Sequence, residues 1–376
     1  MTLFEKKEQC CGCGACAAVC PVQAITLVSD GRFSYPRIDE AKCVGCGKCE
    51  RVCAFRLPKD ETPNCLAAYA VKAPRETRMV SASGGAFTLL SDAALAMGGA
   101  VYGAAWDKEM RAVHIRADNA AGRDRMRGSK YVRSDTAGVY DAIKKDLSAG
   151  VPVLFTGTPC QVAAVKAACG EEERLYTADL ICHGPASPEI WRQFIALLER
   201  QYGKKVTGFS FRDKAVSWRE YSPLATFADG STVGANDLTG SFTELFRYEL
   251  CLAPSCANCR YASCHREGDI TIGDFWGVEK SLPELDDGAG VSAVMVNTEK
   301  GKRLWEAAPH NAETAPCPWE QIAAGQVNMK QSAAPSPSSE SFYRLCAEKG
   351  MEKALAAYTR TGLKRRTKDK IKKLLG

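Results

Sequence analysis

The sequence predicts a protein of mixed α+β or α/β class, made of a small cysteine-rich module, a larger α/β domain and a basic helical tail. Three observations lead to this prediction. Eight cysteines near the N-terminus repeat one spacing, apolar runs in the middle of the chain alternate with helix-start signals, and basic residues gather at the C-terminal end. The chain has 376 residues, which is enough for two or three domains.

The N-terminal module, expected over residues 1–58, contains two copies of the pattern C-x2-C-x2-C-x3-C. Bacterial two-cluster ferredoxins have this spacing, and in them the fourth cysteine of each copy binds the other cluster. The sequence therefore predicts a ferredoxin-like domain with two 4Fe–4S clusters. One cluster is expected on Cys10, Cys13, Cys16 and Cys53, and the other on Cys43, Cys46, Cys49 and Cys20.

A structural zinc site is the alternative for these cysteines. Zinc usually takes four ligands from two separated C-x2-C pairs, so two interleaved sets of four argue against it. The segment 24–38 between the two copies, with Asp30-Gly31 as its turn, is expected to form a short hairpin. Cys11 is out of register with the repeat and Cys65 lies beyond it, so both are expected to be free cysteines.

Composition points to a soluble protein in a reducing compartment. Hydrophobic content of 45% and charged content of 25% are ordinary for a globular protein. Nineteen cysteines are a high count, and residues 1–9 are charged and lack the apolar core of a signal peptide. We therefore expect a cytoplasmic protein with reduced, metal-binding cysteines in an anaerobic setting. The least charged stretch, residues 83–106, contains Asp92 and two glycine pairs, which favours a buried helix and strand over a membrane span.

The main α/β domain is expected over residues 66–330, after a polar linker at residues 58–63. Residues 151–156 predict a buried strand, Gly157-Thr158-Pro159 a tight turn and residues 160–168 a helix. Residues 175–181 predict another strand, and Ser187-Pro188-Glu189 starts a helix that reaches residue 201. Residues 206–211 and 224–227 are further expected strands.

The loop Ser81-Ala82-Ser83-Gly84-Gly85 stands directly before a helix expected over residues 86–97. Bare N–H groups at a helix start can cradle an anion, and neither Gly84 nor Gly85 has a side chain to block them. On the loop alone, a simple N-cap turn is the stronger interpretation.

A second cysteine group consists of Cys256, Cys259 and Cys264, with the spacing C-x2-C-x4-C. Three ligands are one short of a complete site. The fourth is expected to be Cys160 or Cys182, because each follows a predicted strand end, where open α/β folds place their ligand sites. Cys251 is nearer in sequence. The spacing favours a third 4Fe–4S cluster, with zinc, and His265 as a possible ligand, as the alternative.

The C-terminal part, residues 331–376, is expected to form a linker and a basic helix. From Arg360 onward eight residues are basic and one is acidic, while the whole chain has a net charge of +6. Such a helix can contact an acidic partner or an anionic membrane surface, although a solvated helix end is the favoured interpretation. Nucleic-acid binding is not expected, because the basic residues gather without interleaved aromatic residues.

Several motifs together resemble one known family. The segments CANCRYASCHREGDITIGDFWG (256–277), FTGTPCQ (155–161), DLICHG (179–184) and SASGGAF (81–87) are similar to the coenzyme F420 hydrogenase/dehydrogenase beta-subunit family. RGSKYV (127–132) and FRDK (211–214) match as well, so the resemblance covers nearly the whole chain. The motifs are specific as a set, although each is weak alone.

The resemblance implies a flavin-binding α/β domain in an FAD-containing reductase. In this family the flavin exchanges a hydride with a deazaflavin or another reductant and passes electrons to iron–sulfur clusters. A flavin pyrophosphate would bind at Ser83, Gly84 and Gly85, and Arg127 and Lys130, with Arg133, would neutralise its phosphates. A solvated basic loop is an equally good explanation of these cations. The family also uses a C-x2-C-x4-C cluster motif, which strengthens the expectation of a third cluster.

His183 is the acid/base candidate, since it follows Cys182 at a predicted strand end. Histidine titrates near neutral pH, so it can manage the proton that accompanies hydride transfer. A hydrogen-bonded structural histidine is at least as well supported.

We therefore expect an iron–sulfur flavoprotein oxidoreductase that exchanges electrons with a ferredoxin or another redox protein. Its own ferredoxin module and basic tail distinguish it from stand-alone hydrogenase subunits, so the deazaflavin substrate stays open. One alternative is a flavin-free electron-transfer adaptor. Another is a redox-sensing or accessory protein of polysaccharide assembly, whose basic tail contacts a membrane.

Overall fold

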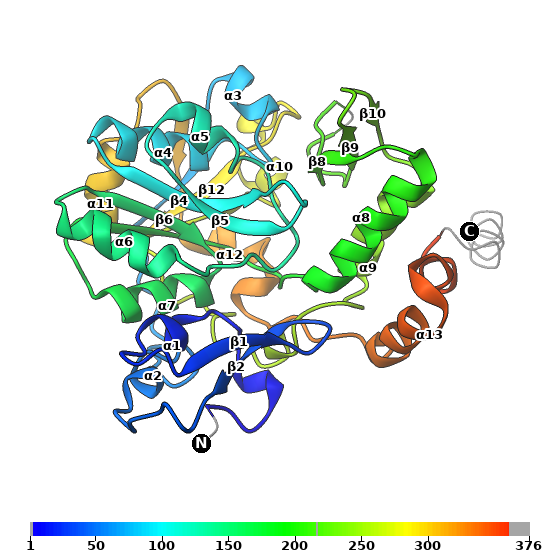
Figure 1. Ribbon diagram of the computed structural model, residues 1–376. Coiled ribbons are helices and arrows are strands. Elements are labelled where there is room, and N and C mark those ends of the chain that lie inside the picture. Colours follow the sequence, from blue (N-terminus) through cyan, green and yellow to red (C-terminus); the bar gives the residue numbers. More distant parts are fainter. Residues whose placement is uncertain (1–2, 216, 361–376) are drawn as a thin grey trace.

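A computed structural model describes residues 3–215 and 217–360 (Figure 1). The basic residues of the predicted tail from Lys364 onward lie outside the described residues, so the basic helix stays a prediction. None of the helices that are described is long and apolar enough to cross a membrane.

The centre of the molecule is an eight-stranded mixed sheet (Figure 1). Its strands follow one another in the order β13 (Glu313–Pro316), β3 (Ala67–Lys72), β12 (Ser292–Val296), β11 (Ile270–Asp274), β7 (Leu175–Leu180), β6 (Val153–Gly157), β4 (Ala100–Trp106) and β5 (Ala112–Ala117). The four strands β11, β7, β6 and β4 are mutually parallel, and the outer strands pair antiparallel. The carboxyl ends of the parallel strands therefore meet at one edge of the sheet.

Helices cover both faces of this sheet (Figure 1). Buried residues of α4 (Ala86–Ala96) and α11 (Glu299–Glu306) pack on one face, where α5 (Ala120–Asp124) also lies. Residues of α6 (Val139–Ser148) and α7 (Pro159–Cys169) pack on the other face. Strands that are covered on both faces need continuous apolar runs, which is why Val153, Leu154 and Phe155 are all buried.

The predicted elements of the central domain are present. The predicted strand–turn–helix unit is β6 followed by α7, whose N-cap Thr158 exchanges hydrogen bonds with Gln161 in a capping box. The second predicted pair is β7 followed by α8 (Pro188–Tyr202), with Ser187 as the N-cap. Residues 206–211 and 224–227 also form strands, but β8 (Val206–Ser210) and β9 (Leu224–Phe227) pair with β10 (Thr232–Val233) in a separate antiparallel sheet.

A second group of helices packs beside that small sheet (Figure 1). Helices α8, α9 (Asp237–Arg247) and α13 (Ser339–Tyr358) share one aromatic core, in which Trp191 stacks on Trp106 at a centroid distance of 4.8 Å. Helix α13 precedes the basic segment and has no counterpart among the predictions. The shorter helices are α3 (Arg75–Met79), α10 (Val278–Ser281), η3 (Pro283–Leu285), α12 (Trp319–Ala324) and η4 (Val327–Met329).

The N-terminal module lies below α6 and α7 (Figure 1). The predicted hairpin is confirmed as β1 (Ile25–Ser29) and β2 (Ser34–Ile38), with Ile25 opposite Ile38. The Asp30 carboxylate accepts hydrogen bonds from the Arg32 and Phe33 N–H groups and so closes the turn. The remaining short helices near the cysteines are η1 (Lys7–Gln9), α1 (Ala15–Ala18), α2 (Lys48–Arg51) and η2 (Pro254–Cys256).

Hydrogen bonds fix this module to the central domain. The carbonyl oxygen of Cys13 accepts from the Thr136 hydroxyl at 2.7 Å and from the Tyr140 hydroxyl at 2.6 Å. The Tyr261 hydroxyl donates to the Ala54 carbonyl at 2.6 Å. The first cysteine loop is thereby positioned against α6, and the residue after the second cysteine copy is positioned against the segment that contains Cys256 and Cys259.

Candidate functional site

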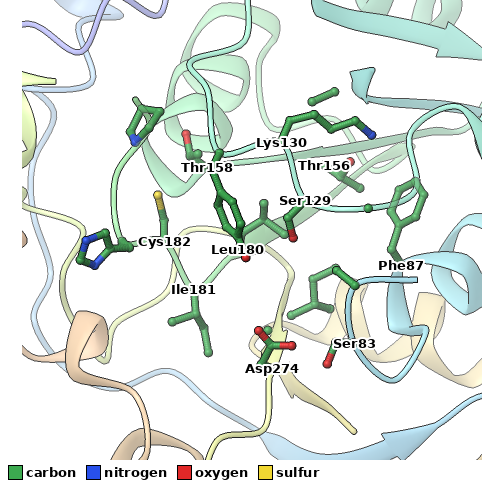
Figure 2. A pocket seen from close by; sticks show the side chains of 18 of the residues that line it. Ser83, Phe87, Ser129, Lys130, Thr156, Thr158, Leu180, Ile181, Cys182 and Asp274 are labelled. Carbon is green, nitrogen blue, oxygen red and sulfur yellow. The ribbon is translucent and has the colours of Figure 1, made fainter. Parts of the chain in front are cut away.

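A cavity of about 460 Å³ lies at the carboxyl edge of the parallel strands (Figure 2). Its walls include the ends of β6, β7 and β11 and the residues that follow them. This is where open α/β sheets bind ligands, because the loops diverge there. In Figure 2, Cys182 lies on one side of the pocket, and Lys130 and Phe87 lie on the other.

The start of helix α4 forms one wall of the cavity. Gly85 is its N-cap with φ +91°, and a Cβ there would lie 2.7 Å from the Cβ of Ala73, so only glycine fits. The Ser83 hydroxyl donates to the Val291 carbonyl at 2.9 Å. The first N–H groups of a helix lack partners within the helix, so this wall presents donors to a bound anion.

Gly84 differs from its predicted place in the cradle. It does not line the cavity, and a Cβ at this position would meet the Val71 carbonyl oxygen at 2.2 Å and the Ser292 nitrogen at 2.3 Å. Its carbonyl oxygen accepts from the Ala73 N–H at 2.8 Å. Gly84 therefore allows the loop to lie directly against strands β3 and β12, and it supports Gly85 without facing the ligand space.

The buried Lys214 holds the same loop in place. Its ammonium group donates to the carbonyl oxygens of Arg78 at 2.7 Å and Ala289 at 2.8 Å, and also to that of Ser83. Burial lowers the pKa of Lys214 to about 7. Lys214 belongs to the FRDK motif, and no feature of that motif predicts its place beside Ser83.

Arg127 and Lys130 both line the cavity, as the predicted phosphate site requires, but their contacts differ. The Lys130 ammonium group donates to the Met126 and Arg127 carbonyl oxygens at 2.9 and 2.8 Å, and burial lowers its pKa to about 7. Arg127 contacts Asp124 at 3.1 Å, while its buried Nε has no hydrogen-bond partner among the described residues. Of these two cations, Arg127 is the one with a donor that has no partner in the described chain.

His183 follows Cys182 in the loop after β7 and lines the cavity. Its Nδ1 is 3.4 Å from the Asn328 Oδ1, and its Nε2 is 3.5 Å from a Glu249 carboxylate oxygen. Glu249 has φ +58°, an uncommon conformation for a residue with a side chain. A carboxylate beside one ring nitrogen and an amide beside the other orient the imidazole.

Four cysteines from three separate segments gather beside the cavity. Cys160 begins α7, Cys182 follows β7, and Cys256 and Cys259 belong to the second cysteine group. Burial raises the pKa of the Cys256 thiol, and Cys182, Cys160 and Cys259 raise it further through their nearby charge. Burial likewise raises the pKa of Cys182 to about 12, with added effects from Cys160 and Cys259. Both candidates for the fourth ligand are therefore present together.

Cys264 lies apart from these four thiols. Its Sγ is 3.5 Å from the Met329 carbonyl oxygen, and the charges around it come from Lys330, Arg266 and Glu320. The Tyr261 side chain turns toward Ala54, and the chain beyond it enters the hydrophobic cluster of Trp276 and Trp319. The predicted cysteines of the third set therefore differ in their surroundings: Cys160 and Cys182 both lie near Cys256 and Cys259, whereas Cys264 does not.

The eight N-terminal cysteines line two small cavities of about 30 and 20 Å³. The first is lined by Cys10, Cys13, Cys16 and Cys53 and also by Cys11 and Cys49, and the second by Cys20, Cys43, Cys46 and Cys49. Each local trio thus meets the distant fourth cysteine that the spacing predicts. No group of three or more His, Cys, Asp or Glu side chains among residues 3–215 and 217–360 is arranged to hold a single metal ion.

Cys11 lies where the first cysteine loop meets the third set. It contacts Cys13 and Cys160, and it packs with Ala163 and Cys259 in one small cluster. The hydrogen bond with Cys13 raises the pKa of Cys11, whereas the one with Cys160 lowers it. The repeat places Cys11 outside the ligand pattern, and nothing in the spacing reveals its neighbour across the domains.

Two charged or titratable side chains of the cavity had no predicted role. His114 on β5 has its Nε2 3.0 Å from the Thr156 carbonyl oxygen, and burial lowers its pKa to about 4. Asp274 lines the cavity, pairs with Arg212 and keeps one buried oxygen without a partner in the described chain. Arg212 and Asp274 belong to the motifs FRDK and GDFWG, and these motifs are the sequence signal by which the pair could have been found.

A module with two interleaved cysteine sets, joined to a mixed α/β sheet, defines an iron–sulfur redox protein. Residues 9–57 match the family model for a 4Fe-4S dicluster domain, and residues 151–318 match that for the C terminus of the coenzyme F420 hydrogenase/dehydrogenase beta subunit. The chain therefore carries an iron–sulfur dicluster domain followed by a region similar to the C terminus of that beta subunit, which supports iron–sulfur electron transfer and is consistent with an oxidoreductase.

One solved structure, a xenon derivative of the F420-reducing [NiFe] hydrogenase complex from Methanosarcina barkeri, is similar to this chain at 17% identity and a TM-score of 0.48. The similarity covers 77% of this chain and 96% of that one. A comparison with curated proteins gives no match.

Proposed function

We propose that the protein is an iron–sulfur flavoprotein oxidoreductase, in which FAD in the cavity exchanges electrons with three 4Fe–4S clusters. One observation carries this proposal: Cys182 both lines the cavity and belongs to the group of four cysteines. The place for a two-electron cofactor and a set of cluster ligands therefore share a residue.

The residues around the cavity fit a flavin nucleotide. Its volume lies within the range of cofactor sites. The start of α4 and the free Nε of Arg127 suit a pyrophosphate, and the unpartnered oxygen of Asp274 suits a ring donor. When bound there, FAD would convert hydride chemistry into single-electron steps.

His183 is the proposed catalytic residue. Its Nε2 lies 3.5 Å from the Glu249 carboxylate at the edge of the cavity. An imidazole in this position can hold the proton that accompanies hydride transfer.

The three cysteine sets form a continuous series through the molecule. We propose Cys160, Cys182, Cys256 and Cys259 as ligands of the third cluster, next to the cavity. Cys11 contacts both Cys160 of this set and Cys13 of the first N-terminal set. Cys49 lines the cavities of both N-terminal sets. Cys46 of the second set is exposed, so a ferredoxin or another redox protein would meet the chain there.

The test is anaerobic purification followed by assay of iron, acid-labile sulfide and flavin per chain. About 12 iron atoms with one FAD would support the proposal, since each cubane holds about four. About 8 iron atoms without flavin, even after FAD is added, would overturn it and leave a flavin-free electron-transfer adaptor. A protein that binds FAD would then be tested with reduced deazaflavin as the hydride donor.

A further inference from the structure

Arg133 lies between the first cysteine loop and the third cysteine set. Its N–H donates to the Ala186 carbonyl at 3.0 Å, and the neighbouring Val132 bridges to Ala186, so the β7–α8 connection fixes its backbone. The side chain lies in the wall that separates the cavity described above from a second space of about 670 Å³ beside Cys10 and Cys11.

The guanidinium group of Arg133 has no conventional counter-ion. Its Nη1 lies 3.6 Å from the Cys160 sulfur, and its buried Nε and Nη2 have no hydrogen-bond partner in the described chain. Among the described residues no aspartate or glutamate forms an ion pair with it. An unpaired buried cation is costly, so its position indicates that anionic groups come to lie beside it.

Thiols face Arg133 from both domains. Its charge lowers the pKa of Cys10 and Cys11 on one side and of Cys160, Cys182 and Cys256 on the other. Cys10 belongs to the first predicted cluster, and the last three belong to the third set. One cation is therefore shared between the ligands of two sites.

The surroundings keep Arg133 in this place. Thr136 and Tyr140, on the same segment, hold the Cys13 carbonyl oxygen at 2.7 and 2.6 Å. On the other side, the Ser134 hydroxyl accepts from the Gln161 amide at 3.0 Å, which ties the segment to the start of α7 beside Cys160. The two ligand loops and the guanidinium group therefore form one rigid junction.

We propose that Arg133 is a positioning residue that acts as the shared counter-ion of the first and third clusters and raises the reduction potential of both. A cluster gains one negative charge on reduction, and a fixed positive charge in a poorly hydrated junction stabilises that charge. Arginine suits this role because it stays protonated at every pH at which the protein is folded. The inference rests on the proposed function for the third cluster but not for the first.

The experiment is a potentiometric titration of the anaerobic holoprotein, followed by EPR of each reduced cluster. In Arg133→Gln we expect the reduction equilibrium of both clusters to weaken, by about tenfold each, which corresponds to about 59 mV for one electron. Arg133→Lys, which keeps the charge, should restore most of the shift. Arg303→Gln, on the surface of α11, should change nothing, since that side chain pairs with Glu173 far from the cysteines.

A second pair of variants covers the case in which Arg133→Gln loses iron. Cys11→Asp places a negative charge next to the guanidinium group, and Cys11→Asn is its neutral match. The aspartate variant should show the lower potential. Equal potentials in this pair, or an unchanged potential in iron-replete Arg133→Gln, would overturn the proposal. Wild-type protein with only the two N-terminal clusters would instead contradict the proposed function, while the effect on the first cluster could still be measured.

Discussion

At the scale of single residues, the surroundings of each thiol indicate which cysteines belong to the proposed third set of cluster ligands. Cys182 is half-buried and lies near Cys160, Cys256 and Cys259, whereas Cys264 packs near Met329. We expect Cys182→Ser to lose about four iron atoms per chain, the content of one cubane, while Cys264→Ser retains them. Iron assay and EPR of the reduced proteins measure both. Loss of iron from the Cys264 variant, with normal content in the Cys182 variant, would restore the ligand set that the sequence favours.

The difference between the two cysteine regions is physical. The N-terminal sets can be read from spacing, because two residues between ligands let one short loop curl around a cluster. The third set depends on contacts between segments far apart in the chain, namely the start of α7, the end of β7 and the Cys256 loop. Local spacing includes Cys264, but it contains no information about the hydrogen bond from the Tyr261 hydroxyl to the Ala54 carbonyl, which joins two distant segments.

The buried histidine of β5 predicts how stability depends on pH. Burial lowers the pKa of His114 to about 4, against about 6.5 in the unfolded chain. Below pH 6.5 the histidine becomes protonated in the unfolded state, whereas it stays neutral in the folded state until the pH approaches 4. Stability is therefore full above pH 6.5 and falls by about 1.4 kcal/mol for each pH unit down toward pH 4.

Chemical denaturation between pH 7.5 and 5 measures this loss, and His114→Gln is the matched variant because it cannot titrate. The glutamine protein should show a flatter profile over that range. Parallel profiles for the two proteins would mean that His114 is protonated equally in both states and would rule out its contribution.

At the scale of elements, helix α4 has a glycine in a left-handed conformation near each end. Gly85, with φ +91°, packs against Ala73, whereas Gly98, with φ +72°, has open space around it. Gly85→Ala should cost roughly 1–3 kcal/mol of stability through backbone strain, with the close contact in addition. It should also weaken FAD binding about tenfold by displacing the cradle, a change of about 1.4 kcal/mol.

Gly98→Ala is the control for that prediction. It has the same backbone strain of roughly 1–3 kcal/mol but lies at the far end of the helix from the cavity, so FAD affinity should not change. Thermal unfolding and flavin fluorescence titration separate the two effects. Equal FAD affinities in the two variants would show that the start of α4 does not contact the cofactor.

Helices and strands were predictable where the signals lie in the local sequence. They were less predictable where contacts with distant segments decide which sheet a strand joins. The β6–α7 and β7–α8 units carry apolar runs, a capping box and proline at the helix start, and all four elements are present. The pattern of β8 and β9 identifies strands but contains no information about which sheet they join. Their separate sheet follows from aromatic packing with α8 and α9, in which Phe209 and Phe227 are buried.

At the scale of the whole molecule, the cysteine sets differ in their exposure to solvent. Cys46 of the second set is exposed, while the third set lies at the junction of the N-terminal module and the sheet, where burial raises the pKa of Cys182 to about 12. Oxygen must reach a cluster to destroy it. We therefore expect air to remove iron in stages, first about four atoms from the second site and last those beside the cavity.

Iron retention and EPR followed over time after exposure to air measure this order. Cys43→Ser, which removes a ligand of the second set, should lack the fast phase and keep the slow one. A single rate for all the iron, or earliest loss of the signal that Cys182→Ser abolishes, would contradict the graded arrangement. Graded loss would match the proposed series of sites, which begins beside the cavity and ends at the exposed Cys46, where the proposed electron partner would have access.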